Sequence, residues 1–257
     1  METEYIFISP HLDDAVLSCG ELIYKLVNNK NAKCKILTIF TGSIKSHKIS
    51  CAIQQFHLNC QRGRDLMLFR KQEDAEATKI LNCTYEHLEF PECIYRTNKE
   101  GAYIYPKLDQ IYKYNPAQEK CYEEKIENIL FKKLKDKINT EIYAPLSIGN
   151  HVDHVITNKI MYQLSKKIPG IIYYYEDVPY IFKVTDKTEE MKTKTKQLKM
   201  KIIKISDSEW QRKMLAVLLY KSQMHVMWKN VKAMISEMDN ASHRYSKERS
   251  IRIWQYK

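Results

Sequence analysis

The chain has 257 residues, of which 44% are hydrophobic and 28% are charged, and its formal net charge is +11. This composition is typical of one globular domain with a large core and excludes a disordered chain. The positive charge admits a nucleic acid, an anionic membrane surface or an anionic small molecule as a partner. The basic residues are diffuse apart from residues 183–204, and no zinc-finger spacing is present. A lysine-rich solvent-exposed surface is therefore the simplest interpretation.

The seven cysteines are odd in number, and no two of them form a C-x-x-C pair. This pattern argues against a disulfide framework or a structural zinc knuckle and favours reduced thiols. The acidic start Met1-Glu2-Thr3-Glu4 does not resemble a secretory signal. No apolar run approaches the roughly 20 residues that span a bilayer. We therefore expect a cytoplasmic protein without a membrane span.

In chain order, residues 5–8 form an apolar run that predicts a strand, and a helical pattern follows from residue 16. Residues 34–41 predict a second, buried strand, so the chain begins as a right-handed parallel unit. Residues 42–60 show little periodicity and are predicted to be a loop. A long helix is expected over residues 62–81.

The second half of the chain continues the alternation of strands and helices. Further strands are predicted at 84–90, 141–145 and 171–176, and further helices at 119–137, 155–164, 206–222 and 226–238. Residues 97–116 are predicted to be a loop, and residues 183–205 alternate lysine with other residues in a way that suits an exposed hairpin. Ser206 and Glu209 are spaced as a capping box. The tail at 248–254 is short and mixed.

Two predicted strand-to-helix turns carry histidine together with aspartate, namely His11, Asp13 and Asp14 in the first and His151, Asp153 and His154 in the second. The carboxyl ends of parallel strands share one edge of a sheet, where binding sites form. His11, Asp14 and His154 would supply two nitrogens and one oxygen to a catalytic metal that keeps one position open.

Asp13 and His151 would then remain for proton transfer, and Asp153 could fix the tautomer of an imidazole. Taken alone, the Asp13–Asp14 pair also fits an N-cap followed by a first-turn acid. The occurrence of two such turns, one of them beside Gly149, favours a metal site.

These residues resemble the motifs of the PIG-L/LmbE-like zinc-dependent deacetylases. Pro10-His11-Leu12-Asp13-Asp14 is similar to the first motif of the family, and His151-Val152-Asp153-His154 is similar to the second. Residues 70–73, 90–96, 175–180 and 220–223 resemble further blocks, so the likeness extends over most of the chain. Ala15 stands where the family often has glutamate, and this removes a carboxylate beside the metal motif.

The resemblance implies a Rossmann-like three-layer α/β sandwich with a mostly parallel sheet, in a single domain over residues 1–257. We treat residues 183–205 as a surface hairpin inserted into it. The implied activity is zinc-dependent hydrolysis of an N-acyl group, usually acetyl, on an amino sugar or its conjugate. Another divalent metal such as Fe²⁺ also fits the ligand types. The expected partner is this small-molecule substrate, and no nucleic acid is expected. Whether the chain forms a homo-oligomer is left open.

Carried over position by position, the resemblance assigns a role to each candidate residue. His11, Asp14 and His154 would bind zinc, and Asp13 would be the general base. His151, supported by Asp153, would stabilise the oxyanion as an imidazolium or protonate the leaving amine. Arg70 and Arg96 would contact the substrate.

Two other functions compete with this interpretation. His11-Leu12-Asp13 also reads as H-x-D, which together with a distant histidine would form the facial triad of a non-haem iron oxygenase. That class would need an all-β, barrel-like context, whereas helices are predicted after both turns. A basic nucleic-acid-binding protein is the second alternative, and it rests on the net charge alone.

Overall fold

The first strand, β1 (Glu4–Ser9), is buried on both faces in the computed structural model. Its residues Tyr5 to Ile8 expose at most 4% of their surface. Such continuous apolar strands occupy the interior of parallel sheets that helices cover on both sides. The structure describes residues 3–30, 32–43, 49–60 and 66–257.

Within the described residues, seven strands form one sheet in the order β3-β2-β1-β4-β5-β7-β6. The strands that follow β1 are β2 (Lys33–Gly42), β3 (Thr84–Pro91), β4 (Thr140–Pro145), β5 (Ile171–Tyr175), β6 (Leu198–Lys204) and β7 (Ser250–Tyr256). The pairs from β3 through β5 are parallel. Only β7 runs against its neighbours β5 and β6. The predicted α/β fold with a mostly parallel sheet is confirmed.

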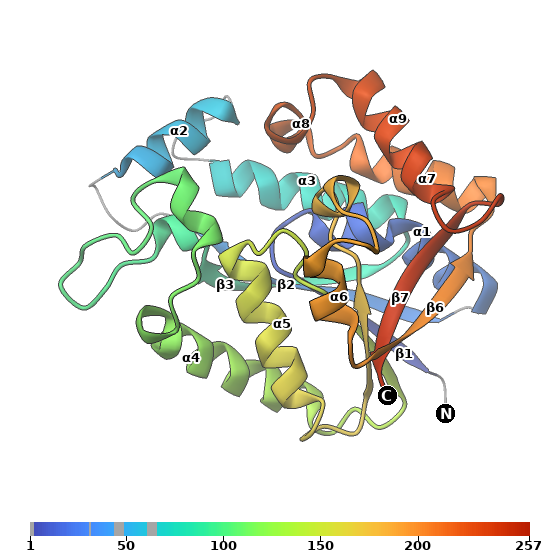
Figure 1. The fold of residues 1–257 in the computed structure, drawn as a ribbon, viewed down its shortest axis with the longest axis horizontal. Coiled ribbons are helices and arrows are strands. Elements are labelled where there is room, and N and C mark those ends of the chain that lie inside the picture. Colours follow the sequence, from blue (N-terminus) through green and yellow to red (C-terminus); the bar gives the residue numbers. More distant parts are fainter. Residues whose placement is uncertain (1–2, 31, 44–48, 61–65) are drawn as a thin grey trace.

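Helices cover both faces of this sheet, which gives the three layers. Figure 1 shows α1, α3 and α7 on one side and α4 and α5 on the other. The helices are α1 (Asp14–Lys30), α2 (Cys51–Asn59), α3 (Leu66–Ile80), α4 (Pro116–Leu134), α5 (Val152–Leu164), α6 (Glu189–Thr195), α7 (Asp207–Val217), α8 (Lys221–Met227) and α9 (Val231–Ser242). In the described part of the chain, none of these helices combines the length and apolarity needed to cross a membrane.

The chain reverses its direction of travel across the sheet between β1 and β4. From β1 it proceeds through β2 to β3, and it then returns to pair β4 with the other side of β1. Ligands of open α/β sheets bind at such a switch point, outside the carboxyl ends of the strands. The two turns that carry the histidines and aspartates follow these two adjacent strands.

The prediction of a hairpin over residues 183–205 is wrong. The segment forms the end of a 3₁₀ turn, η3 (Tyr180–Lys183), then the helix α6 and then the edge strand β6. The partner of β6 is β7, about 50 residues further along the chain. The expected exposure is found, because most residues of β6 are exposed, but the alternating lysines carried no information about the partner of the strand.

Three other boundaries differ from the prediction. The expected loop at 42–60 contains α2, which begins after the N-cap Ser50, and residues 44–48 lie outside the described part. The tail, for which the sequence predicted no element, forms β7 inside the sheet. The capping box of Ser206 and Glu209 is present, although the helix it opens ends at Val217, and α8 and α9 follow.

Candidate metal centre and active site

The turn after β1 is fixed by Ser9. Its hydroxyl donates to the carbonyl of His11 at 2.6 Å and accepts the backbone N–H of Ala15 at 3.0 Å. Ser9 therefore accepts an N–H of the first turn of α1, a role that the capping interpretation had given to the aspartates. Asp14 turns back instead, and its Oδ2 accepts the backbone N–H of His11 at 2.8 Å. The aspartate pair is thus free to serve the site.

The turn after β4 is irregular and leads into α5. Ser147, Gly149 and Asn150 all have positive φ angles. His151 is the N-cap of α5, and its Nδ1 accepts the backbone N–H of Asp153 at 3.3 Å. This arrangement leaves Nε2 of a neutral His151 as an N–H donor. His154 lies in the first turn of the helix and is 1% exposed.

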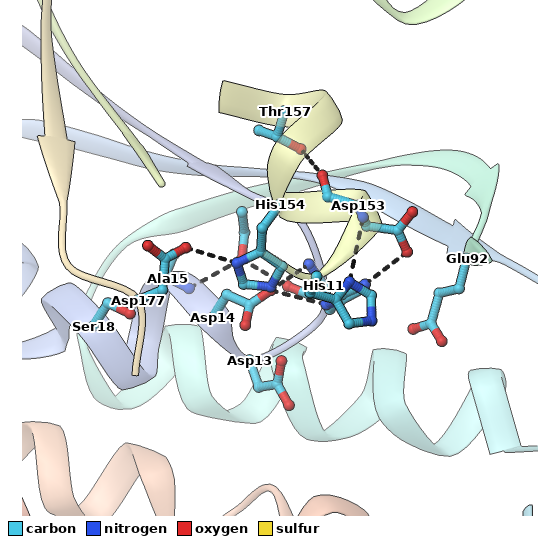
Figure 2. A network of polar contacts seen from close by, with 12 residues as sticks. His11, Asp13, Asp14, Ala15, Ser18, Glu92, Asp153, His154, Thr157 and Asp177 are labelled. Carbon is cyan, nitrogen blue, oxygen red and sulfur yellow. Dashed lines mark hydrogen bonds and ion pairs between the residues drawn. The ribbon is translucent and has the colours of Figure 1, made fainter. Parts of the chain in front are cut away.

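His11, Asp14 and His154 are directed toward one another, as Figure 2 shows. Asp14 Oδ2 lies 3.1 Å from His11 Nδ1 and 3.2 Å from His154 Nε2. Ligand bonds of about 2.0–2.2 Å in a tetrahedral zinc site separate the ligand atoms by roughly 3.3 Å. His154 Nε2 is also buried, and it has no hydrogen-bond partner among the described residues other than this Asp14 oxygen. Spacing and donor types therefore both fit a divalent metal.

Carboxylates hold the other nitrogen of each of these two histidines. His11 Nε2 lies 2.9 Å from Asp153 Oδ2, and His154 Nδ1 lies 2.7 Å from Asp177 Oδ1. Such partners fix the ring orientation and tautomer of metal-binding histidines. Sequence reasoning expected Asp153 to hydrogen-bond one imidazole, and that imidazole is His11. It also expected Asp153 to favour a charged His151, but burial and His11 outweigh this effect of Asp153 on the pKa of His151. Asp177 was missed, although it lies two residues after the end of β5, much as the two motifs follow β1 and β4.

The buried charges at this centre change one another's protonation. Burial lowers the pKa of His154, but its interactions with Asp14 and Asp177 outweigh that effect and raise the pKa to about 9. Burial also acts against ionisation of Asp14, yet His154 and His11 hold its pKa well below the usual range. In the absence of a cation, protonated histidines therefore balance the Asp14 carboxylate. A bound metal would take over that positive charge.

Asp13 lies apart from this trio and faces a cavity of about 320 Å³. Burial, together with repulsion from Asp14, raises its pKa to about 7 in spite of Arg70. Arg70 Nη2 lies 3.9 Å from Asp13 Oδ2, and Arg70 Nη1 forms an ion pair with Glu92. Arg70 and Glu92 line the same cavity. The predicted substrate contact at Arg70 is compatible with this position.

His151 also lines the cavity, with its ring centroid 4.9 Å from that of His11. Burial, with a further contribution from His11, lowers the pKa of His151 well below its usual range. The expectation of a His151 imidazolium therefore does not match its surroundings. A neutral His151 ring that donates a hydrogen bond through Nε2 matches these surroundings.

The predicted substrate contact at Arg96 does not fit the structure. Its side chain is fully buried, and it is absent from the residues that line the cavity. Arg96 Nη1 lies 2.6 Å from Asp153 Oδ1, and Nη2 lies 3.0 Å from Glu119 Oε1. Arg96 therefore acts through Asp153, whose other oxygen orients His11. Its place as the last residue of the resembling block 90–96 did not reveal that its side chain faces inward.

Solved structures of deacetylases share this fold. The zinc-inhibited form of teicoplanin deacetylase Orf2 matches with a TM-score of 0.86 at 22% identity, covering 98% of this chain and 97% of that one. The A40926 pseudoaglycone deacetylase Dbv21 matches with a TM-score of 0.76 at 23% identity, covering 99% and 97%. These likenesses show that the chain shares the α/β fold of these proteins.

Family membership follows from the sequence comparison. The family model of PIG-L, GlcNAc-PI de-N-acetylase, matches residues 6–165, and the chain belongs to this family. The 2'-N-acetylparomamine deacetylase of Niallia circulans is 30% identical over 194 residues, which span 68% of this chain and 67% of the relative. The protein of the same name from Streptomyces fradiae is 23% identical over 176 residues, spanning 68% and 57%. The resemblance inferred from the motifs is confirmed.

The two competing functions find no support in these observations. The oxygenase interpretation needed His11 and Asp13 as joint ligands, whereas Asp14 is the aspartate that approaches His11 and His154. It also needed a barrel-like β context, and the sheet is of the α/β kind. The nucleic-acid interpretation rested on charge alone, and the relatives are deacetylases.

Proposed function

We propose that the protein removes an N-acetyl group from an amino sugar or an amino-sugar conjugate by metal-assisted hydrolysis. His11, Asp14 and His154 would hold the cation, which we take to be Zn²⁺, with Fe²⁺ as the other candidate. The observation that carries the proposal is the approach of Asp14 Oδ2 to both histidine nitrogens, at 3.1 and 3.2 Å. The acetylated amino-sugar substrate named for the Niallia circulans relative supports this substrate class.

The chemistry divides between the cation and the side chains around it. When bound, a divalent metal polarises the amide carbonyl and lowers the pKa of water. Asp13 lines the cavity beside Asp14 without joining the ligand trio, so its carboxylate accepts the proton of the attacking water. Arg70, 3.9 Å away, limits the mobility of that carboxylate.

His151 stabilises the oxyanion of the tetrahedral intermediate. Its Nδ1 accepts the Asp153 N–H, so the proton of the neutral ring lies on Nε2, and the side chain lines the cavity. A donor aimed at a developing oxyanion contributes through a preorganised hydrogen bond. The amine must gain a proton before it leaves. Asp13 holds the proton taken from water and returns it to the nitrogen.

Four variants test this assignment, with metal content and acetate release as separate measurements. Asp13→Asn and His151→Gln should keep their metal and lose roughly 100- to 10,000-fold in kcat, the range for general acid–base residues. His11→Ala and His154→Ala should lose both metal and activity. The substrates are a panel of N-acetyl amino sugars, including 2'-N-acetylparomamine.

His87→Ala is the matched control, because His87 pairs with Asp74 and does not line the cavity. It should retain both metal and activity. Stoichiometric metal in His154→Ala would contradict the ligand assignment. Normal turnover in Asp13→Asn would contradict the general base, and no acetate release from any substrate would contradict the function.

A cytoplasmic location belongs to the same proposal. It rests on the seven cysteines, all of which are free in the structure. Free thiols persist in reducing compartments.

A further inference from the structure

The cavity at the histidine–aspartate centre has a charged base and an apolar mouth. Asp13, Asp14, Arg70 and Glu92 line the base. The mouth is lined by side chains from α2, from the 3₁₀ turn η2 (Leu108–Tyr112) and from α8. We call this group the apolar collar, and it consists of Phe56, Leu108, Ile111, Tyr112, Val226 and Met227.

The apolar collar is continuous with the reacting end of the cavity. The Tyr112 ring meets the His151 ring edge-on, with centroids 5.9 Å apart. The Phe56 ring lies 5.9 Å from the guanidinium carbon of Arg70. The backbone N–H of Ala52 in α2 donates to the carbonyl of Pro106 at 2.9 Å, which ties α2 to the segment carrying η2. A substituent of a sugar bound at the base therefore meets the collar first.

Parts of the collar expose apolar surface to water. Tyr112 is 48% exposed and Val226 is 38% exposed, beside a cavity of about 320 Å³. Covering apolar surface is favourable in proportion to its area, and each fully buried methylene contributes about fourfold in affinity. An apolar substituent would gain from this surface, and a strongly hydrated one would not.

The charges around the cavity also favour an apolar substituent over a strongly hydrated one. Among the described lining residues, the carboxylates lie at the base, and there Glu92 is already paired with Arg70. Two charges of a bound divalent cation would offset Asp13 and Asp14. Among the described residues that line the mouth, the charged one is Lys183. A polycationic substituent would find no carboxylate among those residues to replace its hydration.

We infer that the apolar collar is a subsite for an apolar or aromatic aglycone attached to the acetylated amino sugar, in preference to a polycationic one. This inference rests on the proposed deacetylase function. It narrows the substrate to glycosides of hydrophobic alcohols, phenols or lipids. It also separates this chain from its relatives that are named for an aminoglycoside substrate.

The test compares three substrates with the metal-loaded protein: methyl and octyl glycosides of N-acetylglucosamine, and 2'-N-acetylparomamine. The octyl glycoside should exceed the methyl glycoside at least tenfold in kcat/KM, and 2'-N-acetylparomamine should fall below the octyl glycoside. Calorimetric binding of the two deacetylated glycosides supplies a readout without turnover. The octyl product should bind at least tenfold more tightly and with a more negative heat-capacity change.

Variants of Met227 locate the effect in the collar. Met227→Glu should reduce the octyl-to-methyl ratio at least fivefold, whereas Met227→Leu should leave it within twofold. Leu108→Ser is a second variant, on a different element, and should lower the ratio in the same direction. The ratio is taken within each variant, so a loss of folded protein affects both substrates equally.

The outcomes separate the two proposals. No acetate from any substrate would remove the proposed function, while the calorimetry would still test the collar. Acetate release without preference, or a preference for 2'-N-acetylparomamine, would overturn the inference and leave the deacetylase function standing. A ratio unchanged in both Met227→Glu and Leu108→Ser would place the apolar subsite elsewhere and also overturn the inference.

Discussion

Asp177 is the residue that sequence reasoning missed and on which His154 depends. Its Oδ1 lies 2.7 Å from His154 Nδ1, and its Oδ2 accepts the backbone N–H of Ile148 at 2.8 Å. One side chain therefore orients a proposed metal ligand and holds the loop before it. Removing such an outer partner costs about 10- to 100-fold in metal affinity.

We predict that Asp177→Asn weakens zinc binding by this factor while the protein stays folded, because asparagine keeps the shape and one acceptor oxygen. Competition with a chelator measures the affinity, and circular dichroism checks the fold. Asp186→Asn is the control, since Asp186 pairs with Arg252 and its side chain is 61% exposed. Equal zinc affinity in Asp177→Asn and the wild type would contradict the orienting role.

At the scale of elements, the loop before α5 is held between α6 and Tyr180. Glu190 of α6 accepts the backbone N–H of Gly149 at 2.8 Å. On the other side, a Cβ at Gly149 would lie 2.4 Å from Tyr180 Cδ1. The Tyr180 ring packs edge-on against His154, with centroids 5.5 Å apart. The small residue therefore allows the loop, Tyr180 and His154 to pack together.

Gly149→Ala is predicted to destabilise the protein in two ways. Its φ of +84° costs an L-residue about 1 kcal/mol, and the contact with Tyr180 adds roughly 1–3 kcal/mol of overpacking. Gly101→Ala is a matched control, because Gly101 has φ +78° and no atom within 4 Å of the added Cβ. Urea unfolding should show the larger loss for Gly149→Ala. Equal losses in the free energy of unfolding of the two variants would mean that the Tyr180 side chain moves aside without cost.

The elements could be predicted wherever their signal is local. The apolar runs of β1 and β5 and the periodicity of α5 are visible in single stretches of sequence. The strand β7 was not recognised, because Arg252 interrupts its apolar residues. That charge is tolerated because Glu176, the residue after β5, and Asp186 both pair with it. A pairing across more than 70 residues cannot be inferred from either segment alone.

The residues of the candidate site also divide into those with a local sequence signal and those that depend on distant neighbours. His11, Asp14 and His154 could be inferred, because each lies in a motif next to a predicted strand end, and parallel strands bring those ends together. The inward direction of Arg96 could not be inferred, since it depends on Glu119 of α4 and Asp153 of α5 packing around it. Side-chain direction at a loop is decided by neighbours distant in sequence.

For the whole molecule, the last strand in the chain completes the sheet behind the site. β7 inserts between β5 and β6, and Arg252 Nε lies 2.6 Å from Glu176 Oε1. Trp254 Nε1 donates to the same oxygen at 3.0 Å. Glu176 directly precedes Asp177, so the C-terminal strand fixes the segment that orients His154. Closure of the sheet and the candidate metal centre thus depend on the same short stretch of chain, Glu176-Asp177.

We therefore predict that Arg252→Met destabilises the protein by about 3–5 kcal/mol, because it leaves the buried Glu176 without its cation. Adding Glu176→Gln should recover more than about 1 kcal/mol, which a double-mutant cycle from urea unfolding would measure. Arg249→Met is the surface control: its partners Asp207 and Asp239 have side chains 82% and 41% exposed, so its loss should stay within about 1 kcal/mol. Additive effects of the Arg252 and Glu176 changes would show that burial of β7, rather than this ion pair, closes the sheet.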